Sequence, residues 1–396
     1  MNKIILEKIK EIYKRFENIG CLESGGVTRL GYTEIEDEMH KTFLEIGKEN
    51  GFDVFTDAIG NSYVSNCNKE PAFWIGSHLD SVISGGKYDG VIGVIVGLVV
   101  MIELSKTKSD IPLRVAAFRC EESTNFNKCT IGSGLLTKKY TKEMVENFCN
   151  RNGESLKNIF KERNLGYEAS LDGIKGYFEV HIEQGRVLES KNLSIGIVLA
   201  IVGNERIEIQ IDGVSEHSGS TPMKIRKDSL CFASEFILFL EDYAKKKKDL
   251  VITVGKIDNY PNALNVISGE TKFVIDVRSQ NPEQLLNIRK IINDKLKEIA
   301  KKRKTRASLK EIGKVQPVNL SKEIIKKLAD TSEYLNIPYL EMNSGAGHDG
   351  MCFPDIVKTG MLFIPCKQGI SHNKDEYAKF EDVEKSVEIL IQYFGS

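Results

Sequence analysis

One strand–loop–helix segment constrains the fold of this chain more than any other. A short apolar run at residues 72–75 predicts a buried strand, and a longer run at 91–104 predicts a buried helix. The loop between them carries His78, Asp80 and Asp89 among glycines and serines. Ligand sites of open α/β sheets form at the carboxyl ends of strands. We therefore expect a functional site where this strand passes into this helix.

Composition bounds the class of protein and its partners. A chain of 396 residues predicts two domains, each able to bury a core. The net charge of -1 creates no field that favours nucleic acid or a membrane surface. Lysine runs at 245–248 and 301–304 have no aromatic residues between them and are typical of solvated helix ends. We expect neither nucleic acid nor membrane as a partner.

The uncharged runs, the N-terminal residues and the cysteines predict the cellular location of the protein. The longest uncharged runs, 90–102 and 192–204, are too short to cross a bilayer. The first 15 residues are charged and lack the apolar centre of a signal peptide. Eight cysteines are scattered without CxxC pairs, which indicates free thiols in a reducing compartment. We expect a cytoplasmic protein.

The periodicity along the chain predicts an α/β fold with two domains. Strands alternate with helices from residue 72 onward, which favours a largely parallel sheet after two N-terminal helices and a hairpin. Strict alternation of apolar and polar residues at 206–212 instead indicates a half-exposed antiparallel strand. It opens a β-α-β-β-α pattern. We predict a catalytic domain in two parts, 1–204 and 317–396, interrupted by an α+β insertion at 205–316.

The histidines point to a metal site. Five of the six lie at predicted strand ends or in polar loops, whereas His40 lies in an amphipathic helix and is expected to have a packing or surface role. Imidazole and carboxylate groups are the ligands of zinc and similar ions. No HExxH pair is present, so the ligands must come from several loops. The alternative is five histidines satisfied separately by hydrogen bonds. The candidate ligands are His78, Asp89, Glu121, Glu122, His181 and His372.

A set of short motifs runs in order from residue 76 to residue 376. Each is weak alone, but the ordered set is specific. The motifs are Gly76-Ser-His-Leu-Asp-Ser81, Gly85-Gly-Lys-Tyr-Asp-Gly90, Glu121-Glu122, His181-Ile-Glu-Gln-Gly185, His217-Ser-Gly-Ser-Thr-Pro-Met223, Pro261-Asn-Ala-Leu-Asn-Val266, Asp276-Val-Arg278, Ser344-Gly-Ala-Gly-His-Asp349, and Ser371-His372 with Glu376. The set resembles the M20 metallopeptidase clan. His-Ile-Glu-Gln-Gly is similar to its amidase branch, the hydantoinase/carbamoylase family, which includes N-carbamoyl-L-amino-acid hydrolases, allantoate amidohydrolases and bacterial-type β-ureidopropionases.

The resemblance implies two divalent metal ions per subunit, with zinc expected and manganese or cobalt also compatible. Asp89 would bridge the two ions. One ion would take His78 and His181, and the other would take Glu122 and His372. Asp80 would hold the second imidazole nitrogen of a ligand histidine; the alternative for Asp80 is a loop-capping role.

Glu121 is implied to be the catalytic base. Adjacent side chains diverge, so one carboxylate of the pair can bind metal while Glu121 faces the attacking water and later protonates the leaving nitrogen. The metals would lower the pKa of the water and polarise the scissile carbonyl. Exchanged roles for Glu121 and Glu122 are the alternative.

Other residues are implied to bind the substrate. His217 would cross from the partner subunit's insertion and stabilise the oxyanion; the alternative is a turn histidine. Asn265 and Arg278 would bind the substrate carboxylate, which matches the planar fork of arginine; a surface salt bridge is the alternative for Arg278. The ureido side would be bound by Gln184 and by the loop of Ser344 and Gly345.

Five residues depart from the family pattern or have no assigned role in it. Ser123 and Asn125 stand where the family commonly has glycine and arginine, which leaves the substrate open. Cys120, beside the base, is expected to be a packing residue. His348 and Asp349 are expected to have a role in loop structure or in supporting the ligands.

The resemblance thus implies a phosphorylase/hydrolase-like catalytic domain and an inserted lid and dimerisation domain, hinged near residues 202–204 and 314–317. The expected reaction is cleavage of the carbamoyl C–N bond of an N-carbamoyl-L-amino acid to amino acid, CO2 and ammonia, in a homodimer. Allantoate and N-carbamoyl-β-alanine are the alternative substrates. An aminoacylase or dipeptidase is an alternative within the same clan, and a non-catalytic metal-binding protein is the alternative from another class.

Overall fold

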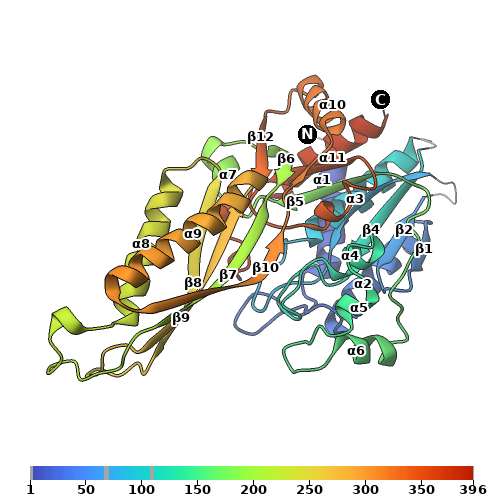
Figure 1. Cartoon of the computed structure of the whole chain (residues 1–396). Coiled ribbons are helices and arrows are strands. Elements are labelled where there is room, and N and C mark those ends of the chain that lie inside the picture. The colour runs from blue at the N-terminus through green and yellow to red at the C-terminus, as the bar shows by residue number, and fades with distance from the viewer. Residues whose placement is uncertain (1–2, 67–70, 108–110, 396) are drawn as a thin grey trace. The chain divides into compact units, whose positions relative to one another are not determined.

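The computed structural model describes residues 3–66, 71–107 and 111–395 (Figure 1). The chain divides into two compact units. Unit 1 contains Met1–Leu199 and Asn319–Ser396, and unit 2 contains Ala200–Val318. The sequence predicts the boundaries after residues 204 and 316. The assignment of these parts as a catalytic domain and a lid stays a prediction.

Unit 1 is organised around a mixed sheet, which within the described residues has nine strands in the order β1-β2-β4-β3-β5-β13-β6-β11, with β12 beside β6. Its middle strands β4, β3, β5 and β13 run parallel, as expected from the alternation of strands and helices. Antiparallel pairs flank them on both sides. The strands are β1 (Asp53–Thr56), β2 (Ser62–Ser65), β3 (Ala72–His78), β4 (Leu113–Phe118), β5 (Ile174–Ile182), β6 (Ile195–Ile201), β11 (Val318–Asn319), β12 (Tyr339–Ser344) and β13 (Thr359–Ile364).

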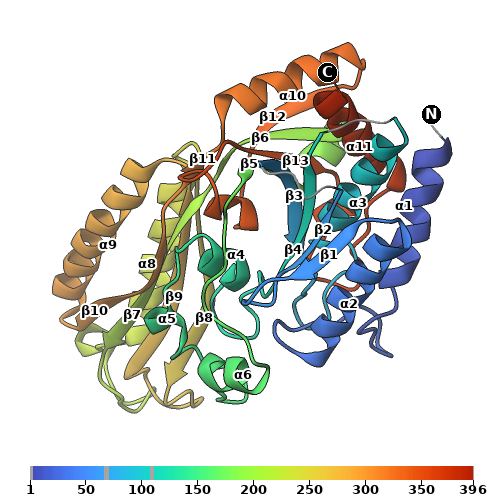
Figure 2. The same ribbon diagram turned by 90° about the vertical axis from the view of Figure 1, so that its right-hand side faces the viewer.

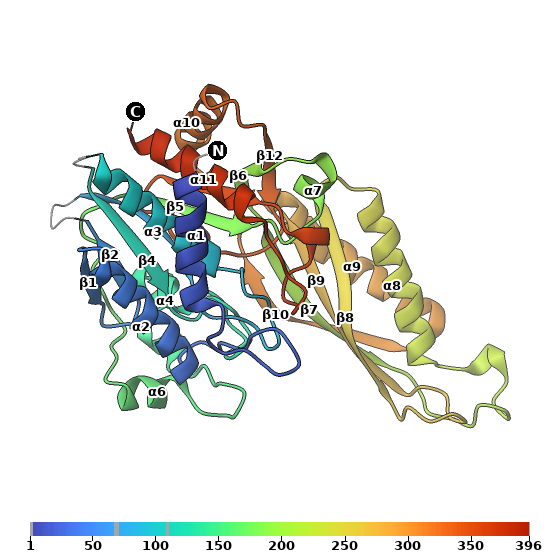
Figure 3. The same ribbon diagram turned by 180° about the vertical axis from the view of Figure 1, so that it is seen from behind.

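The helix that follows β3 forms the centre of the unit 1 core. It is apolar on all sides, so burial on all sides is its stable arrangement. It packs on β3 and is covered by the first and last helices of the chain, as Figure 3 shows. Burial of each of its Val or Ile side chains contributes about 1.5–3 kcal/mol. The helices of this unit are α1 (Lys3–Phe16), α2 (Glu34–Glu49), α3 (Val91–Lys106), α4 (Ile131–Leu136), α5 (Lys142–Val145), α6 (Leu156–Glu162), α7 (Val187–Lys191), α10 (Lys322–Tyr334) and α11 (Phe380–Gly395).

Unit 2 is an antiparallel sheet, with the described strands in the order β10-β7-β9-β8, packed against two helices (Figure 2). Residues of β7 and β9 alternate between buried and partly exposed, which confirms the predicted half-exposed strand. The buried face packs with the helices into a separate core. The elements are β7 (Gly203–Asp212), α8 (Ser229–Lys245), β8 (Leu250–Tyr260), β9 (Glu270–Ser279), α9 (Pro282–Arg303) and β10 (Arg306–Val315).

The sequence reading missed β10 and the short helices α4 to α6. Strand β10 lies at the edge of its sheet and carries charges at Arg306, Lys310, Glu311 and Lys314, so it lacks the apolar run that marks a buried strand. Helices α4 to α6 are too short for a clear helical period. Among the described helices, α3 included, none combines the length and apolar composition that a membrane crossing requires.

Candidate metal centre

The predicted ligands meet at one edge of the unit 1 sheet. His78 ends β3, Asp89 lies just before α3, and His181 lies near the end of β5. Glu122 follows the end of β4, and His372 follows the end of β13. Because the carboxyl ends of parallel strands share one edge, these five side chains come from separate segments to one point.

Gly90 makes the opening loop possible. Its φ is 68°, in the left-handed region that favours glycine. A Cβ at this position would lie 2.5 Å from the ring of His78. Any other residue would therefore push the histidine away from Asp89.

The first candidate ion site consists of His78, Asp89 and His181, whose ligand atoms lie within 4.8 Å of one another. His181 Nε2 is 2.9 Å from Asp89 Oδ1, and His78 Nε2 is 3.8 Å from the same oxygen. All three residues are buried. His181 is oriented by its Nδ1, which lies 2.9 Å from the carbonyl oxygen of Ile182.

The second candidate ion site consists of Asp89, Glu122 and His372, with the same spacing limit. His372 Nε2 lies 3.0 Å from Glu122 Oε1 and 3.2 Å from Asp89 Oδ2. Asp89 therefore belongs to both sets, with one carboxylate oxygen directed at each. This is the arrangement in which a carboxylate can bridge two ions.

The residues fit divalent metal ions. Asp89 Oδ1 is buried and has no hydrogen-bond partner among the described residues, although two imidazole nitrogens face it. Burial raises the pKa of Asp89, but the imidazoles of His181, His372 and His78 outweigh this and hold that pKa well below its usual range. Hydrogen bonds to Asp89 and Glu122 raise the pKa of His372 to about 10. The cluster thus favours positive charge, and its nitrogen and oxygen donors suit zinc, manganese or cobalt.

Asp80 contacts both the imidazole of His78 and the backbone of the Glu121–Glu122 turn. Its Oδ1 lies 3.3 Å from His78 Nδ1 and accepts a 3.0 Å hydrogen bond from the backbone N–H of Glu121. Its Oδ2 accepts a 3.0 Å bond from the N–H of Glu122. One buried carboxylate thus orients an imidazole and fixes the turn that carries both glutamates.

Glu121 lies beside the two candidate ligand sets and belongs to neither. Its Oε2 is 3.9 Å from His78 Nε2. Burial, together with the negative charges of Glu122 and Asp349, raises the pKa of Glu121 well above its usual range, against the opposing charge of His78. A free carboxyl group with a raised pKa has the proton affinity that a general base and acid needs.

The predicted ureido-side residues lie in two places within unit 1. Gln184 has a φ of 56°, and its Nε2 donates a 2.9 Å hydrogen bond to Asp89 Oδ2. Its Oε1 is buried and has no hydrogen-bond partner in the described chain. Ser344 is buried and its Oγ lies 2.8 Å from His348 Nε2, whereas Gly345 is exposed. His348 therefore supports the Ser344 loop, and its ring also packs on His181 at a centroid distance of 4.4 Å.

The remaining predicted residues belong to unit 2. His217 is exposed, and its Nδ1 accepts hydrogen bonds from the backbone N–H groups of Gly219 and Ser220. Asn265 is also exposed, and its backbone carbonyl accepts a hydrogen bond from the backbone N–H of Ser218, next to His217.

Arg278 is held by a neighbouring acid. Its Nε lies 2.9 Å from Asp276 Oδ1. Arg206 binds the second oxygen of Asp276 at 3.0 Å. Burial raises the pKa of Asp276, but the two arginines outweigh it and lower that pKa overall.

A buried ion pair that the sequence reading missed supports the Glu121–Glu122 turn. Glu36 accepts hydrogen bonds from the backbone N–H of Cys120 at 2.8 Å and from Arg119 Nη1 at 2.9 Å. Cys120 is buried with a φ of 52°, which agrees with a packing role. Asn125 donates to the carbonyl of Gly31 and is structural. The available signal was that Glu36 continues the apolar stripe of its helix, where an acid requires a partner.

His40 and Asp349 also have structural surroundings. His40 is buried, with Nδ1 at 2.9 Å from Ser62 Oγ, in agreement with a packing role. Asp349 is buried and accepts a hydrogen bond from Ser133. Its second oxygen has no partner among the described residues.

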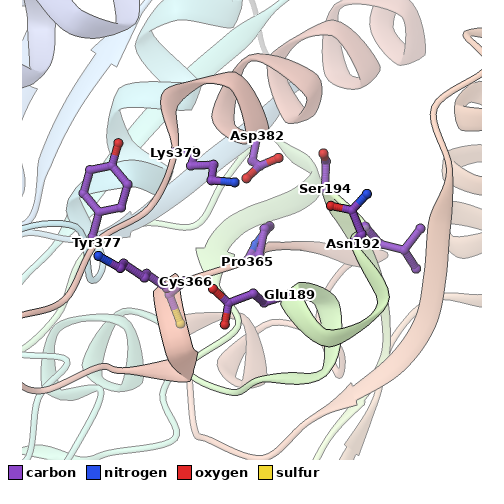
Figure 4. A pocket seen from close by; sticks show the side chains of 10 residues that line it. Glu189, Asn192, Ser194, Pro365, Cys366, Tyr377, Lys379 and Asp382 are labelled. Atoms are coloured by element: carbon purple, nitrogen blue, oxygen red, sulfur yellow. The ribbon is translucent and has the colours of Figure 1, made fainter.

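A separate pocket of about 350 Å³ lies within unit 1, between α7, the end of β13 and the start of α11. Figure 4 shows its mixed lining, with acidic Glu189 and Asp382 and basic Lys379. None of its lining residues is a predicted site residue. It touches the site's surroundings through Cys366, whose Sγ lies 3.8 Å from the carbonyl of Gly185.

Comparison with known proteins agrees with this geometry. The family description peptidase family M20/M25/M40 matches residues 74–395. The chain is 34% identical over 397 residues to the N-carbamoyl-L-amino acid amidohydrolase of Geobacillus stearothermophilus, covering 97% of this chain and 96% of that protein. It is 33% identical over 395 residues to the allantoate amidohydrolase of Escherichia coli, with 97% and 96% covered.

A solved structure shares the whole fold. The crystal structure of an amidase of the hydantoinase/carbamoylase family from Burkholderia multivorans has a TM-score of 0.90 and 28% identity, covering 99% of this chain and 96% of that one. The resemblance inferred from the motifs is confirmed. The matched family is metal-dependent, in keeping with the candidate ligand sets. The chain belongs to the peptidase M20 family, among its carbamoylase and allantoate amidohydrolase type hydrolases.

Proposed function

We propose that the protein is a dinuclear metal-dependent amidohydrolase that cleaves the carbamoyl C–N bond of an N-carbamoyl-L-amino acid. The products are amino acid, CO2 and ammonia. The observation that carries the proposal is the sharing of Asp89 between two candidate ligand sets, beside a carboxylate that belongs to neither. A structural ion site has no need of such a carboxylate, which argues against a non-catalytic metal-binding protein.

In this proposal His78, Asp89 and His181 hold one ion, and Asp89, Glu122 and His372 hold the other. The ions supply Lewis-acid polarisation of the substrate carbonyl and lower the pKa of water. Glu121 takes the proton from the attacking water and gives it to the departing nitrogen. Asp80 keeps the imidazole of His78 and the backbone of Glu121 in place throughout.

The substrate end is proposed from the motif match and from side-chain chemistry. Gln184 and the loop of Ser344 and Gly345 bind the ureido group. Arg278, with Asn265, binds the carboxylate through its planar fork, and the contact with Asp276 supports this by orienting that fork. His217 stabilises the developing oxyanion.

Two alternative substrates fit the same chemistry. Allantoate and N-carbamoyl-β-alanine each join a ureido group to a carboxylate. Two of the relatives are named as allantoate amidohydrolases, which supports allantoate. Pocket shape decides among the three.

A homodimer formed through the insertion is part of the proposal. Strand β8 lies at one edge of the unit 2 sheet, so its outer backbone groups are available for pairing. Large apolar side chains on β8 and the loop after it are exposed, which supports association. They are Val251 (60% exposed), Ile257 (48%), Tyr260 (67%) and Leu264 (106%).

We also infer a cytoplasmic location. No disulfide joins the cysteines that the structure describes, in keeping with a reducing compartment.

Ammonia release tests the function. Purified protein loaded with zinc or manganese is assayed with N-carbamoyl-α-amino acids, N-carbamoyl-β-alanine and allantoate. We expect turnover of an N-carbamoyl-L-amino acid that disappears in Glu121→Gln. Preference for allantoate or N-carbamoyl-β-alanine would move the assignment within the branch, and activity on none of the three would refute the proposal.

A further inference from the structure

Glu376 joins the two loops that carry Asp89 and His372. Its carboxylate is buried, with the residue only 5% exposed. Oε1 accepts backbone hydrogen bonds from Tyr88 at 2.9 Å and from Asp89 at 3.0 Å. These partners are 288 and 287 residues away in the chain, so one side chain sets the distance between two segments that are remote in sequence.

Ser371 completes the connection. Its Oγ lies 2.9 Å from Glu376 Oε2 and 3.0 Å from Asp89 Oδ2. Ser371 immediately precedes His372, and the backbone N–H of Glu376 bonds to the carbonyl of Asn373, which closes the turn after that histidine. The backbone of Asp89 and the turn carrying His372 are thus tied to Glu376, and the single hydroxyl proton of Ser371 is shared between the carboxylates of Glu376 and Asp89.

The loop before Asp89 leaves room for this carboxylate. A Cβ on Gly86 would lie 2.0 Å from the carboxyl carbon of Glu376. The φ of Gly86 does not lie in the left-handed region, so alanine is sterically excluded here by Glu376 and not by backbone strain. The glycine therefore matches Glu376 specifically.

We propose that Glu376 is a positioning residue for the second ion site. By fixing the spacing between Asp89 and His372, it sets the affinity of the site made of Asp89, Glu122 and His372. The site made of His78, Asp89 and His181 depends less on it, because both histidines come from strands β3 and β5. The inference rests on the proposed function, since it assumes that the two sets bind ions.

The variants differ in which hydrogen bonds of Glu376 they keep. Glu376→Ala removes all three contacts. Glu376→Gln keeps an acceptor for the two backbone N–H groups, and its amide N–H can donate to Ser371 Oγ. The single proton of Ser371 then remains available for Asp89. Gly86→Ala displaces the carboxylate of Glu376 by adding a methyl group to the facing loop, and it alters no polar group.

The experiment is a zinc titration of the full-length, chelator-treated protein against a competing chromophoric chelator. We expect wild type to bind two equivalents. In Glu376→Ala and Gly86→Ala, one equivalent should weaken by about 10–100-fold, while the other stays within about threefold of wild type. Glu376→Gln should stay within about threefold for both. The control is Glu384→Ala, which removes another fully buried glutamate of unit 1, on α11, and should leave both affinities unchanged.

Two results would overturn the proposal. One is a Glu376→Ala protein, or a Gly86→Ala protein if the first does not fold, that keeps both zinc affinities. The other is a Glu376→Gln protein that loses as much affinity as Glu376→Ala, since charge and not positioning would then be responsible. Failure of wild type to bind two ions would refute the proposed function itself, which is a different outcome.

Discussion

The two units hold their predicted functional side chains differently. In unit 1, His78, Asp89 and His181 are buried and lie against one another, with partners from distant loops. In unit 2, His217 and Asn265 are exposed, and the hydrogen bonds of His217 stay within its own turn. We infer that the candidate ligands are preorganised within unit 1, whereas the imidazole of His217 in unit 2 is held by hydrogen bonds from its own turn.

The largest effect should come from Glu121→Gln, which separates chemistry from ion binding. The amide cannot accept the proton of water, so kcat should fall by about 10²–10⁴-fold. Zinc content by mass spectrometry should not change, because Glu121 belongs to neither ligand set. Glu122→Gln is the matched control and should lose zinc. Retained turnover in Glu121→Gln would remove it from the role of base.

A smaller effect is expected from Arg278→Lys in unit 2. Lysine keeps the charge but loses the two parallel hydrogen bonds to a carboxylate. KM should rise by about 10–100-fold, the equivalent of one charged hydrogen bond or more, with zinc content unchanged. The control is Arg206→Lys, which contacts the same Asp276. Equal KM values for the two variants would make Arg278 a structural ion-pair residue.

The smallest effect is expected from Leu264→Ser, which tests association through unit 2. Removing a fully exposed side chain should change the free energy of unfolding by less than about 0.5 kcal/mol. The dimer dissociation constant, measured by light scattering over a dilution series, should rise by up to about tenfold. Ile4→Ser, at a position 65% exposed in unit 1, is the control. A monomer with full activity in the wild type would exclude a role for His217 across a dimer.

The sequence predicts the strand, loop and helix that carry His78 and Asp89 well, because each is marked by a pattern of neighbouring residues. The apolar run 91–104 lies in α3, and the run 72–75 lies in β3, which continues to His78. His78 and Asp89 lie on one segment that ends at Gly90, so their closeness in space is a local feature of the chain. Asp80 lies only two residues after His78, so its contact with that imidazole is local as well. Each of these depends on neighbours along the chain.

Longer-range features are less visible in the sequence. Glu376 appears in its motif as one acid in a polar loop, and nothing local indicates that it binds the backbone of Asp89. Glu36 similarly resembles a helix-start acid, although it pairs with Arg119 behind the turn that carries Glu121 and Glu122. Strand β10 forms by pairing with β7, so its charged residues gain strand structure from a partner and not from their own pattern.

Metal analysis of Asp89→Asn beside His78→Asn tests the central claim most directly. If Asp89 bridges two ions, its loss should empty both positions, so that zinc content falls from near two equivalents per chain to near zero. His78→Asn should weaken one position and leave about one equivalent. Retention of a full equivalent of zinc by Asp89→Asn, with both variants folded, would contradict a shared ligand and with it the dinuclear centre.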